Sequence, residues 1–501
     1  MTINVVYLSY FSSSPQYGLE ALENFLESYK NKEAGIEHSL TILAKNWTDK
    51  ISYEKLCNLA EECGARVIDL PDDGWDFGAY FRAAKILNDD YLFFIGTACI
   101  IYADNWLLNS YNAFKNDESV QLVGAMGSYG YIKDVEAEVF PNFHIRTCAF
   151  MMKRELFLEY VSTQKFPETK EDTYQIEHGE NSLTKFVLNK GYDAVVVNCD
   201  GEVFSAPSWV FSETYRSPGK MKSIIVDKHS YFYYTSDDTI RGLLERAAWG
   251  WNLMDTKIKI FVSYHKLAPR LESEVFQPIF NGADEAKNNI FALKDNIGIN
   301  ISEKNHSYHE LTGHYWIWKN ILPYINTLYI GFSQYHRFLD FNLSLDNSTL
   351  FSRVQIEEFT EMCAKYSEEN IMKCVQDFDV VLPQKGALQS SVAETFLQIF
   401  SQKDLDLISE IIEENYPQYS KVIKKVLSEK SLYTNLVFIM KRELLSEYME
   451  WLFNILPSLE TKISCKISDV AEILFNIWLN HNIEVKQLRI KETSSIFIEG
   501  I

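Results

Sequence analysis

The chain has 501 residues, of which 47% are hydrophobic and 14% aromatic, and its formal net charge at pH 7 is −21. This composition excludes intrinsic disorder and is typical of well-packed globular domains. The negative charge argues against nucleic acid as a partner and against a broad electrostatic contact with anionic lipid, but a few local cations could still hold a nucleotide. The length exceeds what a single core usually supports, so we expect two domains.

Targeting and redox features favour a cytoplasmic location. No stretch reaches the roughly 18 apolar residues that a membrane-spanning helix needs. The N-terminus, M-T-I-N-V-V-Y-L-S-Y-F, lacks the basic region of a signal peptide and predicts a first strand. The eight cysteines form no Cys-x-x-Cys pair and no zinc spacing, which indicates reduced core residues. Any peripheral contact with the inner face of a membrane would be local or made through a partner.

Short apolar strands alternate with amphipathic helices along the N-terminal half. We expect strands at residues 3–9, 39–44, 66–70 and 91–95, and helices at residues 19–29 and 53–63. This alternation predicts crossover connections and a mainly parallel sheet.

The pattern restarts in the C-terminal half, with expected strands at residues 258–263, 327–331 and 380–382. A polar and aromatic passage, residues 205–257, separates the halves and contains an expected helix at 237–251. We therefore place a boundary near residue 250. The expected fold class is α/β, with two Rossmann-like, mainly parallel modules in tandem, residues 1–250 and 251–501.

The most unusual segment, residues 295–320, combines asparagines, histidines, a glutamate and a lysine with Tyr and Trp side chains. Buried segments carry few such groups, because each polar group needs a partner. Amides, a carboxylate and indole rings together suit a sugar or nucleotide site. The alternative is a polar loop followed by an amphipathic helix whose tryptophans point into the core.

This segment and seven further blocks in the same order resemble a bacterial glycosyltransferase family of capsule and lipopolysaccharide clusters. The blocks are K-I-K-I-F-V-S-Y-H-K (257–266), P-I-F-N-G-A (278–283), Y-I-G-F-S-Q-Y-H-R-F-L (329–339), D-V-V-L-P (379–383), N-L-V-F-I-M-K (435–441), W-L-F-N-I-L (451–456) and A-E-I-L-F-N-I-W-L (471–479). The family was long known only as a domain of unknown function, and some members transfer galactofuranose. The resemblance, over residues 255–490, implies a GT-A-like module with a UDP-galactofuranose-like donor.

The same resemblance supplies candidate residues for the C-terminal module. Those expected to bind the donor are His265, Lys266, Asn300, Lys304, Asn305, Tyr315, Trp318, His336 and Arg337. The family usually has His-Tyr-Arg-Arg where this chain has Gln334 to Arg337, which puts the donor contact in doubt. Arg337 is retained, and one guanidinium can bridge two phosphate oxygens.

An inverting transfer needs a carboxylate to take the proton of the acceptor hydroxyl. Glu310 and Glu472 are the candidates in the C-terminal module, because both lie in family blocks. Glu472 sits in an apolar helical stretch, where burial would raise its pKa. The alternative is that Glu472 caps a neighbouring element or pairs with a lysine.

The N-terminal half resembles rhamnan-synthesis and related inverting GT-A glycosyltransferases. The blocks are L-P-D-D-G-W-D-F-G-A-Y-F-R-A-A (70–84), F-P-N-F-H-I-R-T-C-A-F-M-M (140–152) and E-H-G-E-N-S-L-T-K-F-V-L-N-K-G-Y (177–192). We expect donor binding by Gly74, Trp75, Asp76, His144 and Arg146, and catalysis by Glu177 or Glu180, with His178 as an orienting group. Glycines permit close backbone approach, and Asp76 can accept from hydroxyls. The alternative for residues 70–84 is a helix start capped by Asp72 or Asp73.

Metal-dependent GT-A enzymes carry Asp-x-Asp at the end of the fourth strand, where it holds a divalent ion against the diphosphate, and neither half has this motif at the corresponding place. Gly96-Thr97-Ala98 and Gln334-Tyr335-His336 stand in its place, and we interpret Asp377-Phe378-Asp379 as structural. We therefore expect no metal cofactor. Lys266, His336 and Arg337 would meet the leaving-group charge in one half, and His144, Arg146 or Arg154 in the other, unless the N-terminal half has lost activity.

These inferences describe a soluble, bifunctional, inverting glycosyltransferase that builds a bacterial surface polysaccharide from nucleotide sugars. The expected partners are nucleotide sugars, a lipid-linked or polysaccharide acceptor and other polysaccharide-assembly enzymes. Two alternatives stay open. In the first, only the C-terminal module is catalytic and the N-terminal one binds or positions the glycan. In the second, the chain is a non-enzymatic glycan-binding scaffold.

Overall fold

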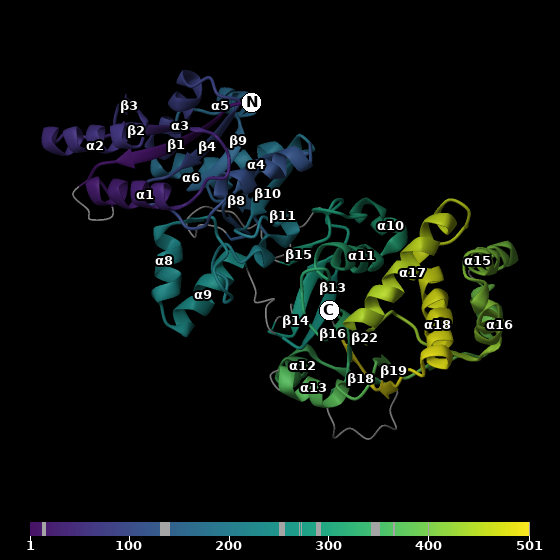
Figure 1. Cartoon of the computed structure of the whole chain (residues 1–501). Coiled ribbons are helices and arrows are strands. Elements are labelled where there is room, and N and C mark those ends of the chain that lie inside the picture. The colour runs from purple at the N-terminus through teal and green to yellow at the C-terminus, as the bar shows by residue number, and fades with distance from the viewer. Residues whose placement is uncertain are drawn as a thin grey trace. The chain divides into compact units, whose positions relative to one another are not determined.

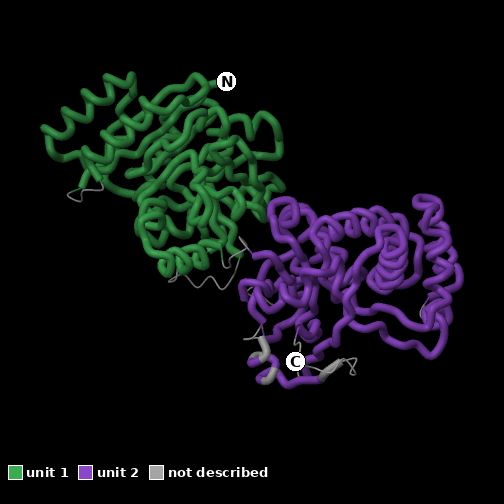
Figure 2. The backbone as a smooth tube through the Cα atoms, turned by 60° about the horizontal axis from the view of Figure 1, so that its bottom comes forward, with its two compact units in different colours: residues 1–252 green, residues 253–501 purple. Residues whose placement is uncertain are grey.

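The computed structural model describes residues 1–12, 17–130, 141–249, 256–269, 271, 273–286, 292–341, 351–363, 366–398 and 400–499. The chain divides into two compact units, Met1–Asn252 and Leu253–Ile501 (Figure 2). The helix expected over 237–251 is observed as α9, Asp238–Trp249, and the last two residues of that expectation lie outside the described residues. Within the described residues, no helix combines the length and the apolar character needed to cross a membrane.

Unit 1 is built on an eight-stranded sheet of order β11-β10-β6-β9-β4-β1-β2-β3 (Figure 1). The strands expected from the sequence are present as β1 (Ile3–Tyr10), β2 (Ser39–Lys45), β3 (Arg66–Leu70) and β4 (Tyr91–Ile95). These four strands are mutually parallel, which confirms the predicted α/β class. The sheet continues through β9 (Ala149–Lys153), β6 (Val120–Gly124), β10 (Asp193–Val197) and β11 (Val203–Ser205). Strand β9 runs antiparallel to both β4 and β6, which the sequence did not predict.

Apolar side chains of the strands and helices form the core of unit 1. Strand β1 is buried from Ile3 to Ser9, and Tyr7 stacks on Phe25 of the first helix with ring centroids 3.8 Å apart. The helices are α1 (Leu19–Asn31), α2 (Lys50–Glu62), α3 (Trp75–Ile86), α4 (Trp106–Asn116), α5 (Arg154–Thr163), α6 (Lys170–His178), α7 (Leu183–Asn189), α8 (Lys228–Thr235) and α9. Short elements complete the unit: β5 (Ile100–Ile101), β7 (Gly127–Ser128), β8 (His144–Ile145), β12 (Ile225–Val226) and the 3-10 helix η1 (Ala206–Ser212).

Unit 2 also begins with parallel strands. These are β13 (Ile258–Tyr264), β14 (Phe276–Phe280), β15 (Leu293–Lys294) and β16 (Tyr329–Gln334). Strand β22 (Phe438–Lys441) runs antiparallel to β16 and to β19 (Val380–Pro383), and β23 (Ile490–Thr493) is parallel to β19. An extension of the sheet contains β17 (Arg337–Leu339), β24 (Ser495–Ile498) and β18 (Phe351–Val354), and β20 (Gly386–Ala387) pairs with β21 (Ser431–Leu432).

The other regular elements of unit 2 are helices. They are α10 (Asn305–Tyr308), α11 (Leu311–Asn320), α12 (Ile356–Cys363), α13 (Glu368–Val375), α14 (Val392–Phe396), α15 (Gln402–Asn415), α16 (Ser420–Ser428), α17 (Arg442–Glu460) and α18 (Ile467–Lys486), with the 3-10 helices η2 (Ser302–Lys304) and η3 (Pro417–Tyr419). The long helices α17 and α18 pack side by side (Figure 1). Most of the buried side chains on α18, including Ile473 and Leu474, are apolar. They lie on several sides of the helix, so α18 packs against neighbours on more than one side.

The two units repeat one strand arrangement. Reading across the sheets, β3-β2-β1-β4-β9-β6-β10 in unit 1 corresponds to β15-β14-β13-β16-β22-β19-β23 in unit 2. Each pair of neighbours has the same parallel or antiparallel sense in both units. The strands also follow one another along the chain in the same order. Residues at equivalent strand ends can therefore be compared directly.

Candidate functional site

A cavity of about 1220 Å³ opens in unit 1 at the carboxyl ends of its parallel strands. Tyr10 of β1, Lys45 of β2 and Gly96, directly after β4, all line it. Ligands of open α/β sheets bind at this edge, because the strand ends and the helix N-termini leave a crevice there. The cavity is therefore the first candidate for the functional site of unit 1.

The loop between β3 and α3 forms one wall of the cavity. Gly74 has φ +69°, and a Cβ atom there would lie 2.3 Å from the Phe166 ring, so the position requires glycine. Trp75 follows with φ +52°, a conformation that is uncommon for a bulky residue and costs backbone strain. Its indole is 44% exposed and lines the cavity, and its carbonyl accepts a 2.9 Å hydrogen bond from Lys45 Nζ. The strained loop thus holds an aromatic face open to a ligand.

Lys170 faces this aromatic wall from helix α6. Its Nζ lies 5.3 Å from the centroid of the Trp75 ring and 5.3 Å from that of Tyr174. Among the described residues no carboxylate forms an ion pair with Lys170. A cation that lines a cavity without a carboxylate partner is suited to bind an anionic ligand group.

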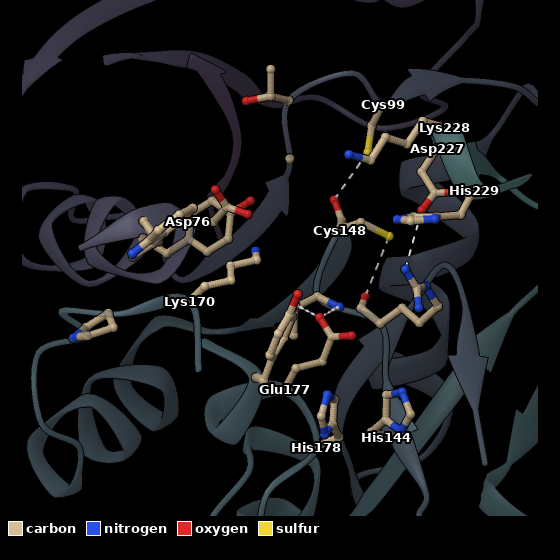
Figure 3. Close-up of a pocket in the computed structure, with 18 of the residues that line it drawn as sticks. Asp76, Cys99, His144, Cys148, Lys170, Glu177, His178, Asp227, Lys228 and His229 are labelled. Carbon is tan, nitrogen blue, oxygen red and sulfur yellow. Dashed lines mark hydrogen bonds and ion pairs between the residues drawn. The ribbon is translucent and has the colours of Figure 1, made fainter. Parts of the chain in front are cut away.

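The inner part of the cavity contains Glu177 of α6 (Figure 3). Its carboxylate accepts hydrogen bonds from the hydroxyl of Thr147 and, at 3.4 Å, from the backbone nitrogen of the same residue. Burial raises the pKa of Glu177, but Arg146, His144 and the Thr147 bond outweigh burial and leave this pKa below its usual value. Glu177 is therefore ionised at neutral pH.

Arg146 is held between two acidic residues. Its guanidinium lies 3.6 Å from Asp227 Oδ2 and 4.6 Å from the centroid of the Tyr215 ring. Asp227 in turn caps helix α8 by accepting from the backbone nitrogen of Ser230 at 2.8 Å. Burial opposes the charge of Arg146, yet Tyr215, Glu177 and Asp227 together raise its pKa well above the usual value. Burial lowers the pKa of His144 to about 4, so this histidine is neutral.

Not every residue expected from the sequence lines this cavity. Gly74, Trp75, Asp76, His144, Arg146, Glu177 and His178 do so. The side chain of Glu180 is instead 90% exposed and pairs with Lys185 at 3.4 Å. Arg154 donates to the Ala84 carbonyl at 2.8 Å, and neither Glu180 nor Arg154 is among the lining residues. Sequence reasoning missed Lys170, because this residue lies two helical turns before Glu177 and outside the blocks.

In unit 2 the structure brings together Glu310, Gln334, Arg337, Asn435 and Glu472. Asn435 donates its backbone N–H to Glu472 Oε1 at 2.8 Å, and Gln334 Nε2 donates to Glu310 Oε1 at 3.4 Å. Arg337 donates to the side-chain oxygens of Asn435 and, at 3.4 Å, of Gln334. The two predicted carboxylates therefore belong to one network around the end of β16.

The environment of this network raises the pKa of both carboxyl groups. Burial raises the pKa of Glu310 to about 7, and the neighbouring Glu472 adds to this increase. Burial likewise raises the pKa of Glu472, against the hydrogen bond from Asn435. Asn435 and Leu436 adopt φ values of +69° and +47° in succession, so backbone strain accompanies the network.

Several basic groups lie beside this network. The ring of Tyr335 contacts Lys266, whose Nζ is 5.3 Å from the ring centroid, and His265, at 5.3 Å between centroids. Burial lowers the pKa of His336 to about 4, and the nearby Arg337, His265 and Lys266 lower it further. Lys266 and Arg337 could neutralise the negative charge of a diphosphate, and the neutral His265 and His336 could donate hydrogen bonds to it.

The other candidates in residues 295–320 have partners within the protein. The rings of Tyr315 and Trp318 pack on Phe453 of α17, at 4.9 Å and 5.8 Å between centroids. Lys304 pairs with Glu460 at 2.9 Å. Asn300 donates to the Gly298 carbonyl at 2.8 Å. Asn305 donates to the carbonyl of His309 and the hydroxyl of Thr312. These contacts favour the alternative interpretation, a structural loop and helix, for this part of the segment.

Two further features concern metal binding. Asp379 pairs with Lys441 at 2.7 Å and accepts from the backbone nitrogen of Arg489, which agrees with a structural role for Asp377-Phe378-Asp379. Within the described part of the chain, no three His, Cys, Asp or Glu side chains are grouped to hold a metal ion.

The main carboxylates of the two units occupy equivalent positions. Glu177 lies on the second helix after β9, and Glu472 lies on the second helix after β22, the strand equivalent to β9. Each accepts a hydrogen bond from a backbone nitrogen just before that strand, from Thr147 in unit 1 and from Asn435 in unit 2. An arginine influences each carboxylate, Arg146 in unit 1 and Arg337 in unit 2.

The chain is similar to one family model and to several solved structures. A family model described as a domain of unknown function, DUF4422, matches residues 259–483. No curated protein matches the chain. The apo structure of the WbbM bifunctional glycosyltransferase is 30% identical at a TM-score of 0.44, over 48% of this chain and 45% of that one. The match thus spans less than half of the WbbM chain.

Two other solved structures share lower identity with the chain. S. aureus TarS 1-349 in complex with UDP-GlcNAc is 14% identical at a TM-score of 0.25, over 36% of this chain and 54% of that one. Glucosyl-3-phosphoglycerate synthase from Mycobacterium tuberculosis, in complex with Mn²⁺, UDP and glucosyl-3-phosphoglycerate, is 18% identical at a TM-score of 0.23, over 31% and 57%.

Proposed function

We propose that the chain is a bifunctional glycosyltransferase whose two units each transfer a sugar from a nucleotide sugar to a growing bacterial surface polysaccharide. The observation that carries this proposal is the equivalence of Glu177 and Glu472. Two units with the same strand order each hold one glutamate against a backbone N–H at the carboxyl edge of the parallel strands. A repeated carboxylate at a repeated ligand-binding edge suits a general base used twice.

In unit 1 the cavity provides a place for each part of a nucleotide sugar. The exposed face of Trp75 offers a platform for the base, and Lys170 lies within reach of the same wall to bind the diphosphate. Glu177, ionised at the inner end, accepts the proton of the acceptor hydroxyl as its oxygen bonds to the anomeric carbon. The bond from that carbon to the diphosphate breaks, and the nucleoside diphosphate leaves with the electron pair, which inverts the anomeric centre.

The transfer in unit 1 is proposed to need no divalent metal. Gly96, Thr97 and Ala98 follow β4, where metal-dependent GT-A enzymes present carboxylates, and Thr97 donates to the Leu8 carbonyl at 2.8 Å. Lys170, Lys228 and Arg146 line the cavity and can compensate the charge of the leaving group.

In unit 2 the equivalent base is Glu472, and His265, Lys266, His336 and Arg337 are proposed to bind the diphosphate. The resemblance of residues 255–490 supports a UDP-galactofuranose-like donor for this unit. Glu310, in the same network as Glu472, is proposed to hold sugar hydroxyls. The alternative in which unit 1 only positions the glycan is disfavoured by its cavity and by the ionised Glu177 within it.

Ligand binding to the full chain tests this proposal. Thermal unfolding is followed with UDP, GDP, CMP, dTDP and their common sugar conjugates, because a ligand that binds the folded state raises the melting temperature. We expect at least one nucleotide to do so and Trp75→Ala to weaken its binding about tenfold or more, as loss of a stacking platform does. Tyr231→Ala is the matched control, since Tyr231 is 71% exposed and does not line the cavity. If no nucleotide shifts the melting temperature and none supports transfer, the proposed function fails.

A further inference from the structure

Helix α6 places a second unusual side chain beside Glu177. His178 is 2% exposed and lines the cavity, and neither of its ring nitrogens has a hydrogen-bond partner among the described residues. Figure 3 shows its ring below Glu177 and beside His144. Leaving a buried polar group without a partner destabilises the folded state, so native proteins retain few such groups. A binding partner from outside the chain would remove this cost.

The position of the His178 ring is fixed by its surroundings. Tyr174 stacks on it, with ring centroids 5.8 Å apart and planes at 22°, and the His144 ring lies 5.4 Å away. Asn142 Nδ2 donates to the backbone carbonyl of His178 at 2.8 Å. The ring is therefore held in place by contacts that leave its two nitrogens for another group.

We propose that His178 recognises a hydroxyl group of an uncharged acceptor sugar beside the Glu177 carboxylate. This inference rests on the proposed function of unit 1 and names the class of acceptor that unit would take. A neutral imidazole has one N–H donor and one nitrogen acceptor, and a sugar hydroxyl both accepts and donates. A sugar hydroxyl could therefore donate to one ring nitrogen or accept from the other.

The cations that influence His178 are already paired with carboxylates, Arg146 with Asp227 and Lys185 with Glu180, which favours an uncharged sugar at this position. The groups that influence its titration are Glu177, Arg146 and Lys185, and burial, the largest cause, lowers the pKa of His178. The ring is therefore neutral at pH 7 and supplies no positive charge to hold a carboxylate. Glu177 is ionised, and the charge of Arg146 is shared between Glu177 and Asp227. A uronic acid or phosphate would thus face an uncompensated carboxylate.

The test compares neutral and acidic glycosides on the full chain. Saturation-transfer NMR is recorded at pH 7.5 with methyl galactoside, methyl glucoside and methyl rhamnoside, and with methyl glucuronoside. We expect binding of at least one neutral glycoside in the millimolar range and none of the glucuronoside. The variant His178→Leu should weaken the neutral glycoside tenfold or more, and His178→Gln, which keeps a donor and an acceptor, should weaken it less.

A stability measurement separates recognition from a structural role. Because His178→Leu removes two unpartnered nitrogens and keeps apolar volume, it should raise the melting temperature of the free protein by about 2–4 °C. The matched control is His38→Leu in the same unit, which should lower the melting temperature. The ring of His38 is hydrogen-bonded to the Tyr29 hydroxyl at 2.8 Å and to the Ile36 carbonyl at 2.9 Å. Leucine at this position would leave the Tyr29 hydroxyl and the Ile36 carbonyl without these hydrogen bonds.

Three results would overturn the inference. One is binding of the glucuronoside in preference to neutral glycosides, and another is unchanged neutral binding in His178→Leu. The third is absence of any glycoside binding while a nucleotide still raises the melting temperature, which would leave the proposed function in place. Loss of both glycoside and nucleotide binding would instead remove the proposed function and this inference together.

Discussion

The carboxyl group of Glu472 raises the pKa of Glu310, so the two predicted carboxylates of unit 2 are electrostatically coupled. Burial acts in the same direction on both groups. Unit 1 is different, because Arg146 and Thr147 hold its carboxylate, Glu177, in the ionised form. The two units thus have a glutamate at equivalent positions, but the surroundings lower the pKa of Glu177 and raise the pKa of Glu472. The pH dependence of transfer should therefore differ between the units.

The first prediction concerns stability and Glu310. Its pKa of about 7 lies above the ordinary value of 4.5, so between these two values the folded state keeps a proton that the unfolded state releases. The contribution of this group is therefore fully present below pH 4.5 and is lost as the pH rises through 7. We expect Glu310→Gln to gain stability relative to the wild type as the pH rises from 5 to 8, by on the order of 1–3 kcal/mol.

The measurement is hydrogen exchange of peptides that cover α11, across this pH range and after correction for intrinsic exchange rates. These peptides report the change in stability close to Glu310. Glu303→Gln is the control, because Glu303 is exposed and precedes α11 by only a few residues. A stability difference between Glu310→Gln and the wild type that does not change with pH would contradict the prediction.

The second prediction separates the roles of Glu472 and Glu310 in transfer. A general base acts only in the transition state, so Glu472→Gln should lower kcat by about 10²–10⁴-fold with little change in KM. Glu310→Gln should mainly raise KM, because a group that holds sugar hydroxyls stabilises substrate and transition state alike. Steady-state kinetics in a Glu177→Gln background measure unit 2 alone. Near-normal turnover of Glu472→Gln together with loss in Glu310→Gln would reverse the roles.

Much of the fold could be predicted from local sequence patterns, and the part that could not be predicted has a physical cause. The apolar runs that became β1, β2, β3 and β4 are short and bounded by helices, which indicates parallel strands. The direction of β9 depends instead on where the chain returns to the sheet, and pairing of Phe94 with Phe150 joins residues far apart in sequence. No local pattern encodes such a pairing.

The residues of the candidate sites could likewise be predicted only in part from the sequence. Trp75, Arg146 and Glu177 could be selected because they lie in blocks that resemble a known family. Tyr315 and Trp318 also lie in such a block, in a segment whose composition suits a sugar site, but the Phe453 ring packs on them from a distant helix. Tertiary packing of this kind is invisible in a segment taken alone. The role of Asn435 depends on its backbone nitrogen, which residue type does not reveal.

The third prediction is that the two units fold separately. Each has its own apolar core, one around Val5, Ile42 and Phe93 and the other around Ile260, Val262 and Ile439. Fragments 1–252 and 253–501 should therefore each give a cooperative thermal transition and native circular dichroism. A fragment that is unfolded alone, while the full chain unfolds in a single transition, would show that the units depend on each other.

The fourth prediction is that transfer by either unit persists in excess EDTA. Cationic side chains at both sites, such as Lys170 and Arg146 in unit 1 and Lys266 and Arg337 in unit 2, are proposed to take the place of an ion at the diphosphate. Initial rates with the nucleotide sugar found by the binding screen, with and without chelator, provide the measurement. Complete loss of transfer in EDTA that manganese or magnesium restores would contradict it.

The fifth prediction uses Arg146 to test Glu177 as the base of unit 1. Because Arg146 is the first influence that opposes burial, its removal should raise the pKa of Glu177. Only the ionised carboxylate can accept a proton, so the acidic limb of kcat/KM for unit 1 should move to higher pH in Arg146→Met. The profile is recorded in a Glu472→Gln background, which silences unit 2.

Two controls make this result specific. Lys170→Met also removes a cation from the cavity, but Lys170 is not among the groups that lower the pKa of Glu177, so it should weaken donor binding and leave the acidic limb in place. Glu180→Gln should retain full activity, because Glu180 is exposed and paired with Lys185, whereas Glu177→Gln should lose about 10²–10⁴-fold in kcat. If Arg146→Met leaves the limb where it is, or if Glu180→Gln and Glu177→Gln behave alike, Glu177 is not the base.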